Sequence, residues 1–371
     1  MDGTTSHITG LAQGLDRLGH TVALAAEDFL ANAPADAASL VRAQLSSAGV
    51  VQYDVSFPRS LHTVNAAKAL RATLTLRRIV REFKPDILHV HWRSTSPYAA
   101  LVRGLTGIPF VSTLHLERIP AGPIMRRLSF WGDRAIAIST ETEDTLATTF
   151  GVDRERITKV WHGVDEGRFR PPSDSERRSA RDSFRIHPDT FVVSVVARVT
   201  RDKGQHLLLQ ALARIRERLP RVVALIAGKG EALTDLRALA SELDVAEKVR
   251  FVGHVDPVAA LWASDLSALP SSIEGFPYSV IESMMCAVPV IRTPAGGYRE
   301  QIVHGENGII IPFGSDEELA SAISALAVDR ARLEAMSEAA HASARSRFSL
   351  SAMATRTESI YEDVLAQARR L

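Results

Sequence analysis

Cysteine is nearly absent from this chain: Cys286 is the single one in 371 residues. One thiol excludes an internal disulfide framework and a zinc site built on several cysteines. Lysine is scarce as well, with six among the 44 Lys and Arg residues, and these are balanced by 43 Asp and Glu. The formal net charge of +1 provides no global field for nucleic acid, so no nucleic-acid partner is expected.

Long hydrophobic runs are missing too. No stretch of about eighteen apolar residues occurs, so no segment has the pattern of a membrane-spanning helix. Residues 1–10 lack a basic segment followed by an apolar one, so we expect no secretory signal and a cytoplasmic protein. The composition, 46% hydrophobic and 23% charged, is that of a folded globular chain. Its length corresponds to two or three domains at roughly 150 residues each.

Short apolar runs alternate with amphipathic segments along almost the whole chain. Strand–helix alternation predicts an α/β fold with parallel sheets and right-handed crossovers. Two series of strands predict two Rossmann-like, doubly wound domains. The expected strands of the first series are Thr21–Ala25, Val50–Val55, Ile87–Val90, Phe110–Thr113, Ala135–Ile138 and Ile157–Val160. Those of the second are Phe191–Val196, Val222–Ile226, Val249–Val252, Leu266–Leu269, Val288–Ile291 and Gly308–Ile311.

The beginning of the sequence is unusual for such a chain. Residues 1–6 form a loop that leads directly into a helix with Ile8, Leu11 and Leu15 at helical spacing. An α/β chain normally opens with a strand before such a loop, and there is no room for one here. We therefore expect the N-terminal sheet to lack its first strand, either because the true start lies upstream or because the strand is absent.

The middle and the end of the chain carry two further organising signals. Arg170–Ser175 is proline-rich and polar, as linkers are, and places the domain boundary between residues 169 and 187. The last periodic segment, 351–368, predicts a helix with Met353 and Ile360 on a broad apolar face.

The first motif with chemical content spans residues 195–204. A strand ends there, and the loop that follows carries Arg198 and Lys203 before a helix begins at Gln205. Ligands of open α/β sheets bind outside the carboxyl ends of the strands. Two cations at such a place would neutralise a diphosphate, although a solvated basic loop would have the same sequence.

The second motif spans residues 270–282 and is more specific. Pro277 fits the first position of a helix, and the free N–H groups around it would form an anion site. Glu274 and Glu282 have seven residues between them. Eight steps along a helix are roughly 12 Å, so both carboxylates reach one ligand only if Glu274 lies in the preceding loop. A third segment has Gly296-Gly297 after a strand, where glycines permit a tight turn and close approach of a ligand.

In this order, the motifs resemble the retaining glycosyltransferases of family 4, which have the GT-B fold of two Rossmann-like domains facing across a cleft. The resemblance rests on Arg198 with Lys203, on the Glu274–Glu282 pair, and on Gly296-Gly297 with Glu300. Other matching segments are Gly3 with His7, 17–22, 85–91, 108–115, 136–139 and 163–165.

The resemblance implies roles for individual positions. Arg198 and Lys203 would bind the donor diphosphate and stabilise the charge of the leaving group. Glu274 and His115 would contact the donor sugar, which completes the expected catalytic set. The expected donor-binding residues are Glu282 on the ribose, together with Gly275, Phe276, Pro277, Tyr278 and Gly3.

The family likewise implies the organisation of the chain and its partners. Residues 1–170 would form the acceptor domain, 171–348 the donor domain, and 349–371 a helix that crosses back to the first domain. The donor would be a UDP- or GDP-linked sugar, the acceptor a glycan, a lipid-linked molecule or a small molecule. No Asp-x-Asp motif occurs, which is typical of a transferase that needs no metal ion and no other cofactor.

Other functions are compatible with parts of this pattern. Paired Glu residues suggest a glycosidase with an acid and a nucleophile, but the family is thought to retain configuration by attack on one face without an enzyme nucleophile. A sugar-nucleotide epimerase or hydrolase of similar fold, and an inactive partner subunit, remain as alternatives.

Three positions depart from the family pattern. Ala197 and Ala287 stand where glycine is usual, and we expect both to be harmless because alanine is small. His162 stands where asparagine is common, which puts a turn or a sugar contact there in doubt.

Two histidines and one cysteine need an interpretation of their own. His89 and His91 lie two apart on a strand and share one face of the sheet. His91 is nearer the carboxyl end and would reach the cleft, whereas His89 would be packed. Without a third ligand nearby in sequence, we predict no metal site. Cys286 is expected to be a buried, apolar residue.

Basic residues gather in two segments of the first domain. Lys68, Arg71, Arg77, Arg78 and Arg81 share a predicted helix, and Arg126-Arg127 precede Phe130-Trp131. These segments would meet anionic lipid around a lipid-linked acceptor, as a peripheral membrane protein does, or form an ordinary solvated surface.

Overall fold

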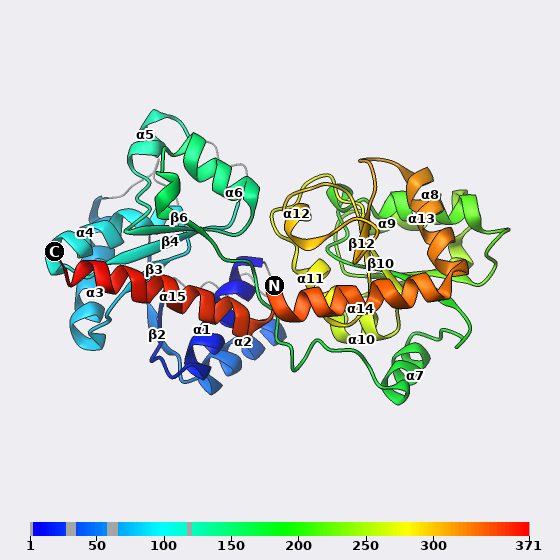
Figure 1. The fold of residues 1–371 in the computed structure, drawn as a ribbon, viewed down its shortest axis with the longest axis horizontal. Helices are drawn as coiled ribbons and strands as arrows, with labels where there is room; N and C mark the ends of the chain where they lie inside the picture. Colours follow the sequence, from blue (N-terminus) through cyan, green and yellow to red (C-terminus); the bar gives the residue numbers. More distant parts are fainter. Residues whose placement is uncertain (1–2, 27–34, 58–65, 117–120, 371) are drawn as a thin grey trace. The chain divides into compact units, whose positions relative to one another are not determined.

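The computed structural model describes residues 3–26, 35–57, 66–116 and 121–370 (Figure 1). These residues belong to two compact units. Unit 1 comprises Met1–Gly163 and Leu350–Leu371, and unit 2 comprises Val164–Ser349. All twelve expected strands are present, and their ends lie within two residues of the expected ones. The α/β class and the GT-B pair of Rossmann-like units are confirmed.

The division between the units lies after Gly163, ahead of the proline-rich segment Arg170–Ser175. Residues 164–169 are held by unit 2 for a local reason. The Val164 N–H donates to the Phe348 carbonyl at 2.9 Å, and Arg168 forms a 2.8 Å ion pair with Asp256.

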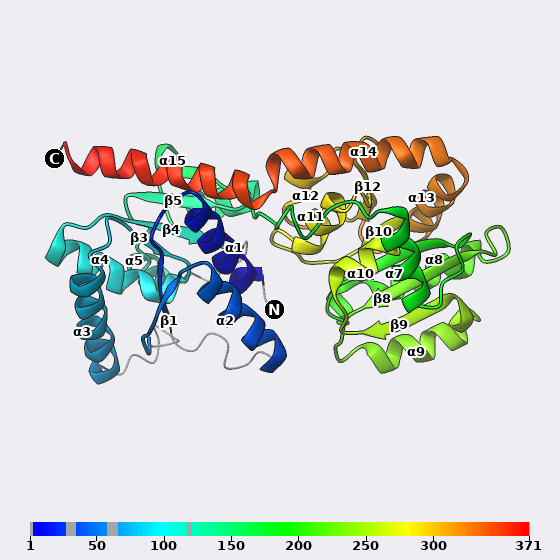
Figure 2. The same cartoon turned by 90° about the horizontal axis from the view of Figure 1, so that it is seen from below.

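Unit 2 is a six-stranded parallel sheet covered by helices on both faces (Figure 2). Its strand order is β12-β11-β10-β7-β8-β9. The strands are β7 (Phe191–Val196), β8 (Val222–Ala227), β9 (Val249–Gly253), β10 (Leu266–Leu269), β11 (Val290–Arg292) and β12 (Gly308–Ile310). The helices are α7 (Asp174–Ser183), α8 (Gln205–Ile215), α9 (Leu233–Glu242), α10 (Pro257–Trp262), α11 (Tyr278–Met285), α12 (Tyr298–Gln301), α13 (Asp316–Val328) and α14 (Arg330–Arg347).

Alternation along β7 explains the two layers of helices. Val193 and Val195 point into a core shared with α8, α9 and α13, whereas Val192 packs with residues of α7 and α10 on the other face. Successive side chains of a strand point to opposite faces, so a largely apolar run such as 191–196, in which Ser194 is the one polar residue, has apolar partners on both sides, as parallel sheets require.

The amino ends of the central strands are pinned by a buried carboxylate. Asp265 precedes β10 and accepts from the Val192 N–H at 2.7 Å. Its oxygens also bind Arg177 at 2.7 Å and Arg181 at 2.8 Å, both on α7. This cluster ties α7 to β7 and β10 at the amino end of the sheet.

Unit 1 contains two groups of parallel strands. β1 (Ala23–Ala26) pairs with β2 (Val51–Asp54), and β3 (Leu88–Val90), β4 (Phe110–Leu114), β5 (Arg134–Ala137) and β6 (Ile157–Lys159) form a separate sheet in sequence order. Within the described residues no ladder joins the two groups. The helices are α1 (Gly3–Arg17), α2 (Ala35–Ser47), α3 (Ala66–Phe83), α4 (Ser96–Thr106), α5 (Pro123–Arg127), α6 (Thr140–Asp144) and α15 (Leu350–Ala368).

The final helix, α15, belongs to unit 1 and lies beside α1 in both ribbon views (Figures 1 and 2). Leu11 and Leu15 of α1 share a buried cluster with Met353 and Ile360 of α15. The two helices approach closely because a Cβ at Gly14 would lie 2.7 Å from the Ala354 Cβ. The apolar face expected for 351–368 is therefore the face that α15 buries.

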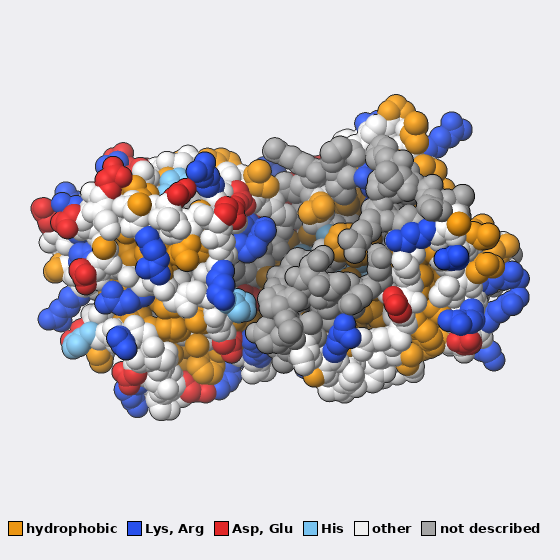
Figure 3. All heavy atoms as spheres, turned by 180° about the vertical axis from the view of Figure 1, so that it is seen from behind, with side chains coloured by type: hydrophobic (Ala, Val, Ile, Leu, Met, Phe, Trp, Pro, Cys, Tyr) orange, Lys and Arg blue, Asp and Glu red, His pale blue; other side chains and the backbone are white. Residues whose placement is uncertain are grey.

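The basic segment of unit 1 forms an exposed stripe on α3. Leu70 is 60% and Leu74 54% exposed, and Arg71, Arg77, Arg78 and Arg81 are exposed on the same side of the helix. Figure 3 shows hydrophobic and basic side chains next to one another along the outer edge of this unit, at the right of the view. Trp131, which was expected to join such a surface, is instead buried against Phe150. No described helix is long and apolar enough to cross a membrane.

Ala287 corrects one expectation. It follows α11 with a φ of +59°, in the left-handed region where the Cβ of an L-residue crowds the backbone. The family's usual glycine would adopt this conformation without that cost. Alanine at this position is therefore strained, whereas Ala197 is not among the non-glycine residues with positive φ.

We expect Ala287→Gly to raise the free energy of unfolding of unit 2 by about 1 kcal/mol, because it relieves the left-handed strain. This would raise the melting temperature by about 2–4 °C in calorimetry. Ala325→Gly, on an exposed position inside α13, is the control and should lower stability by about 1 kcal/mol. If Ala287→Gly lowered the free energy of unfolding as much as Ala325→Gly does, the inference that Ala287 is strained would be wrong.

Candidate functional site

The strand order of unit 2 identifies one edge of its sheet as the place for a ligand. From β7 the sheet grows through β8 to β9 on one side and through β10 and β11 to β12 on the other. The connections after β7 and β10 therefore leave in opposite directions and open a crevice at the carboxyl ends of these two strands. Doubly wound sheets bind their ligands at this switch point.

Lys203 and Glu274 meet at that switch point. The loop after β7 carries Lys203 and the loop after β10 carries Glu274, and the Lys203 Nζ lies 2.7 Å from the Glu274 Oε1. The side chains are only 13% and 10% exposed. The loops are also joined through the backbone, where the Ser272 N–H donates to the Asp202 carbonyl at 2.8 Å. Asp202 adds a second carboxylate, 3.6 Å from the Lys203 Nζ.

Arg198 lies in the same loop as Lys203, and its side chain is exposed. The Gln205 amide, 1% exposed, donates to the Arg198 carbonyl at 2.7 Å. The backbone N–H of Val199, the residue after Arg198, donates to the Lys229 carbonyl at 2.9 Å. The loop after β8 therefore supports the loop that carries Arg198. Gln205 thus positions the backbone that carries Arg198. The sequence indicates Gln205 only as the start of a helix. Its hydrogen bond to the loop could not be predicted, because a buried side-chain amide has no sequence signal of its own.

The helix that follows Glu274 begins one residue later than expected. Pro277 is the N-cap, with φ −65° and ψ 124°, and Tyr278 is the first residue of α11. Glu274 therefore lies in the loop ahead of the helix, which is the condition for it to share a ligand with Glu282. The first amides of α11 have no acceptor within the helix, and the start of this helix is where the expected anion site would lie.

The loop after β11 packs directly against Gly275 and Phe276. Gly297 has a φ of +72°, and a Cβ there would lie 2.8 Å from the Phe276 ring and 2.9 Å from the Gly275 carbonyl oxygen. Glycine is therefore required at 297. Phe276 is buried, and its ring centre lies 5.7 Å from that of Phe348. This packing anchors the loop between β10 and α11 to the core of unit 2.

A buried arginine that the sequence analysis missed shapes this loop. Arg292 is fully buried at the end of β11. Its guanidinium donates to the carbonyls of Ala295 and Gly296, both at 2.8 Å, and to the Gln301 side chain. Gln301 in turn donates to the Pro277 carbonyl at 3.1 Å. Arg292 therefore links the loop after β11 to the start of α11.

Glu282 is the fifth of the eight residues of α11 and is half-buried. Burial raises the pKa of its carboxyl to about 7, opposed by the positive charge of Arg168 and reinforced by Asp256. A carboxyl with this pKa changes charge near neutral pH. Cys286, one turn later, is 1% exposed as expected, and burial raises the pKa of its thiol to about 12.

Unit 1 contains a second group of polar residues, at the carboxyl ends of β3 and β4. His91 and His115 each follow the last residue of their strand, and the two strands are neighbours. The His91 Nδ1 lies 3.2 Å from the His115 Nε2. His7 of α1 is 1% exposed and its ring lies 4.8 Å from that of His115 and 5.0 Å from that of His162.

His89 has a structural role, in agreement with the expectation that it is packed. Its ring lies 4.1 Å from that of His91 on the same face. Its two nitrogens are 2.6 Å from the Tyr361 hydroxyl and 2.7 Å from the Thr113 hydroxyl. The ring thereby joins α15 to β3 and β4.

Burial favours the neutral form of His7, His89, His91 and His115. Burial lowers the pKa of His7 to about 4, and burial with the neighbouring His7 lowers that of His89 to about 3. The pKa values of His91 and His115 are well below the ordinary value, first because of burial and then because of the other histidines. A neutral imidazole has one nitrogen that carries a proton and one that carries a lone pair.

The expected site residues thus fall into two sets. The structure brings together Lys203 and Glu274, with Arg198 in the loop of Lys203, and Gly275, Phe276, Pro277, Tyr278 and Glu282 around the start of α11, all in unit 2. His115 and Gly3, the first residue of α1, belong to unit 1.

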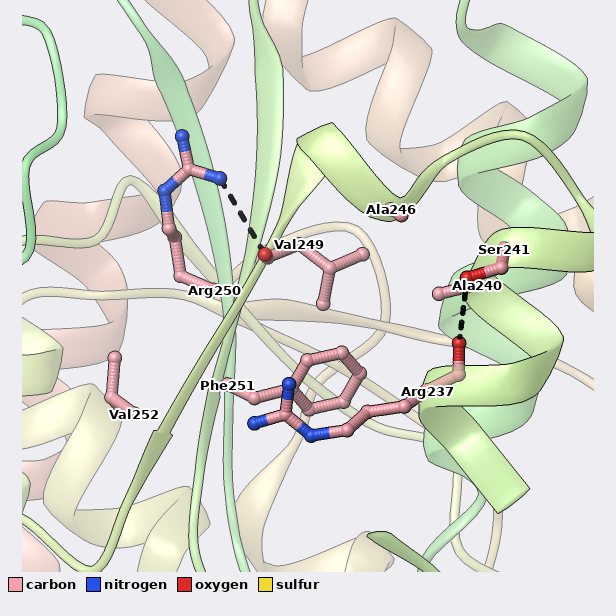
Figure 4. Close-up of a pocket in the computed structure, with 8 residues that line it drawn as sticks. All are labelled: Arg237, Ala240, Ser241, Ala246, Val249, Arg250, Phe251 and Val252. Carbon is pink, nitrogen blue, oxygen red and sulfur yellow. Dashed lines mark hydrogen bonds between the residues drawn. The ribbon is translucent and has the colours of Figure 1, made fainter. Parts of the chain in front are cut away.

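One further hollow in unit 2, of about 270 Å³, lies elsewhere (Figure 4). It is formed by α9 and the edge strand β9, and the Arg237 guanidinium lies 4.9 Å from the Phe251 ring centre there. None of the expected donor-site residues lines it, so it is distinct from the switch point.

Comparison with known proteins agrees with this geometry. A family profile described as "Glycosyltransferase Family 4" matches residues 1–168, and one described as "Glycosyl transferases group 1" matches residues 176–343. D-inositol 3-phosphate glycosyltransferase 2 of Catenulispora acidiphila is 30% identical over 77% of this chain and 72% of that protein. This chain belongs to glycosyltransferase family 4. It is accordingly a glycosyltransferase.

Two further relatives of this glycosyltransferase are named for D-inositol 3-phosphate and for glycogen. D-inositol 3-phosphate glycosyltransferase of Rhodococcus opacus is 32% identical over 68% of this chain and 61% of that protein, so the chain spans about three fifths of that relative. Glycogen synthase of Mycobacterium tuberculosis is 28% identical over 79% of this chain and 72% of that protein.

Solved structures share the GT-B fold. Anabaena Alr3699/HepE in complex with UDP has a TM-score of 0.80 at 22% identity, with 98% of this chain and 96% of that chain covered. A glycosyltransferase from Rickettsia africae has a TM-score of 0.83 at 20% identity, with 98% and 94% covered.

Proposed function

We propose that this glycosyltransferase moves a sugar from a nucleoside diphosphate donor to a hydroxyl acceptor, with retention of configuration and without a metal ion. The observation that carries the proposal is the Lys203–Glu274 ion pair of 2.7 Å at the switch point, beside the first amides of α11. A fixed cation and preorganised N–H groups are what a leaving diphosphate needs as its negative charge grows.

The reaction assigns a task to each group. The bond between the anomeric carbon and the diphosphate oxygen breaks, and the acceptor oxygen bonds to that carbon from the same face. The acceptor's proton passes to the departing diphosphate. Lys203 and Arg198 would hold the diphosphate, so that no metal cation is required there. Glu274 would accept hydrogen bonds from hydroxyls of the donor sugar, and Glu282 from the ribose, while His115 of unit 1 would contact the sugar.

The donor and acceptor classes follow from the relatives. The Anabaena protein is described with UDP, UDP-glucose or glucose, which makes UDP-glucose the first donor to test and GDP-sugars the second. Relatives named for D-inositol 3-phosphate and for glycogen indicate polyhydroxyl acceptors. We therefore propose a polyol, its phosphate or a glycan as the acceptor.

We predict that Lys203→Ala lowers kcat for sugar transfer by about 100- to 1,000-fold, because one preorganised charge on the leaving group is lost. The measurement is transfer from UDP- and GDP-sugars to inositol phosphate and glucan acceptors, with the anomeric configuration of the product read by NMR. An α-linked donor should yield an α-linked product.

The matched control is Lys248→Ala, which removes a lysine at the amino end of β9, where the Nζ binds the Pro220 carbonyl at 2.6 Å. It should keep the parent rate. Parent-like transfer by folded Lys203→Ala protein would refute the site, and an inverted product would refute the stereochemistry.

We predict that binding of UDP-glucose strengthens as pH rises from 6 to 8. The Glu282 pKa is raised to about 7, so the carboxyl is protonated below this pH and becomes a full acceptor for the ribose diol above it. UDP-glucose, whose phosphates do not titrate near neutral pH, isolates this change. Calorimetry should show the pH dependence in the parent and a flat profile in Glu282→Gln, and identical profiles would contradict the role of Glu282.

We further propose that unit 1 contacts the inner face of a membrane through the exposed stripe of α3. Leu70 and Leu74 supply apolar surface, while Arg71, Arg77, Arg78 and Arg81 supply charge on the same side. An amphipathic helix with this pattern binds where apolar chains meet anionic headgroups. This location would suit a lipid-linked acceptor.

We predict that Arg77→Gln with Arg78→Gln weakens binding to vesicles of anionic phospholipid about 30-fold, at about 1 kcal/mol for each cation. Co-sedimentation measures it. Arg332→Gln with Arg345→Gln on α14 removes the same charge from unit 2 and should have little effect. No sedimentation of the parent protein with anionic vesicles would overturn the proposal.

A further inference from the structure

The histidines of unit 1 leave an unexplained group of buried nitrogens. His7 is 1% exposed, and neither its Nδ1 nor its Nε2 has a hydrogen-bond partner among the described residues. The Nδ1 of His115 is in the same condition. A buried polar atom without a partner costs about 1–3 kcal/mol, so native proteins seldom keep several in one place unless they have a task.

The geometry points to that task. His7, His91 and His115 each offer one ring nitrogen, and these three atoms lie within 4.8 Å of one another. The His91 Nδ1 and the His115 Nε2 are 3.2 Å apart. Two nitrogens bound to one tetrahedral ion at about 2.0–2.1 Å are separated by about 3.3–3.4 Å, so this pair already has nearly the spacing of two ligands. His7 completes the set if the widest separation, at most 4.8 Å, closes by about 1.4 Å to the tetrahedral spacing.

We propose that His7, His91 and His115 form a binding site for a late first-row divalent cation such as Zn²⁺. Three imidazoles without a carboxylate favour Zn²⁺, Co²⁺ or Cu²⁺ over Mg²⁺ and Ca²⁺, which prefer oxygen ligands. A three-histidine set leaves one coordination position for water or a substrate oxygen. The site is formed only in the fold, because its ligands come from α1 and from the ends of β3 and β4.

The surroundings are suited to holding these rings in place. His89 lies against His91 with a centroid distance of 4.1 Å, and its own nitrogens are engaged by Thr113 and Tyr361. Partners that orient ligands typically change metal affinity by about 10- to 100-fold. The single proton shared between His91 and His115 moves to another ring nitrogen when both bind the cation, so the neutral pair becomes a pair of ligands without losing a proton.

The site has a consequence that rests on the proposed function. His115 is also the residue expected to contact the donor sugar, and a ring nitrogen bound to a metal cannot accept a hydrogen bond from a hydroxyl. Bound Zn²⁺ would therefore inhibit transfer, and a chelator would restore it. The site is a candidate inhibitory site and not part of the transfer chemistry.

The test is a titration of the chelator-treated full-length protein with Co²⁺, followed by displacement with Zn²⁺. We expect one equivalent of Co²⁺ to give the visible absorption bands of a tetrahedral site, and Zn²⁺ to remove them. His7→Gln and His91→Gln should each weaken Zn²⁺ binding in calorimetry by about 100-fold or more, since each removes a ligand and not merely an orienting partner. His187→Gln changes an exposed histidine beside Asp189 in unit 2 and should bind like the parent.

Circular dichroism and thermal melting show whether each variant is folded, and the parent protein alone suffices to decide if one is not. Absence of Co²⁺ bands and of Zn²⁺ heat in the parent protein would overturn the proposal. So would parent-like affinity in folded His7→Gln and His91→Gln. These readouts do not depend on turnover. Metal binding without any sugar transfer would therefore refute the proposed function and leave the metal site standing, and transfer without metal binding would do the reverse.

Discussion

The reversal of strand order between β7 and β10 is the constraint on which the candidate site in unit 2 of this glycosyltransferase depends. Two adjacent parallel strands whose connections leave in opposite directions open a crevice at their carboxyl ends. The two loops that border it carry Lys203 and Glu274, which meet at 2.7 Å. Seventy residues separate the two in sequence, so local structure alone does not pair them. The sheet brings them together, and the N-terminus of α11 lies beside them because β10 leads into it.

The opposite end of the same sheet shows a different use of charge. Asp265 binds Arg177, Arg181 and the Val192 amide at the amino ends of β10 and β7. These groups satisfy one another and stabilise the layer, whereas the Lys203–Glu274 pair at the carboxyl end borders the crevice. Arg292 serves the carboxyl end indirectly, since it holds the carbonyls of the loop after β11 and, through Gln301, the Pro277 carbonyl at the start of α11. Ala287, with a φ of +59°, shows that backbone strain is tolerated where α11 ends.

Unit 1 concentrates imidazoles where unit 2 concentrates charged residues. His91 and His115 follow neighbouring strands, and α1 inserts His7 between them and His162. Burial and mutual repulsion keep the rings neutral, so they offer lone pairs and N–H donors without a charge. Neutral polar rings are suited to a sugar hydroxyl and to a borderline divalent cation such as Zn²⁺ alike. The same desolvation makes the rings selective for their ligands, because every buried nitrogen left without a partner costs free energy.

The sequence by itself determined the α/β class, all twelve strands and the family, because strand periodicity and loop chemistry are local in the chain. It also identified Arg198, Lys203, Glu274 and Glu282 as candidates, since charged residues after apolar strands stand out. Only the tertiary structure decided which of them meet. Neither Gln205 and Arg292, which act through buried hydrogen bonds, nor the strain at Ala287 has a pattern in the sequence. The histidine cluster escaped for the same reason: its nitrogens come from one helix and two strand ends, and only the packing of α1 onto the ends of β3 and β4 brings three distant imidazoles within ligand distance.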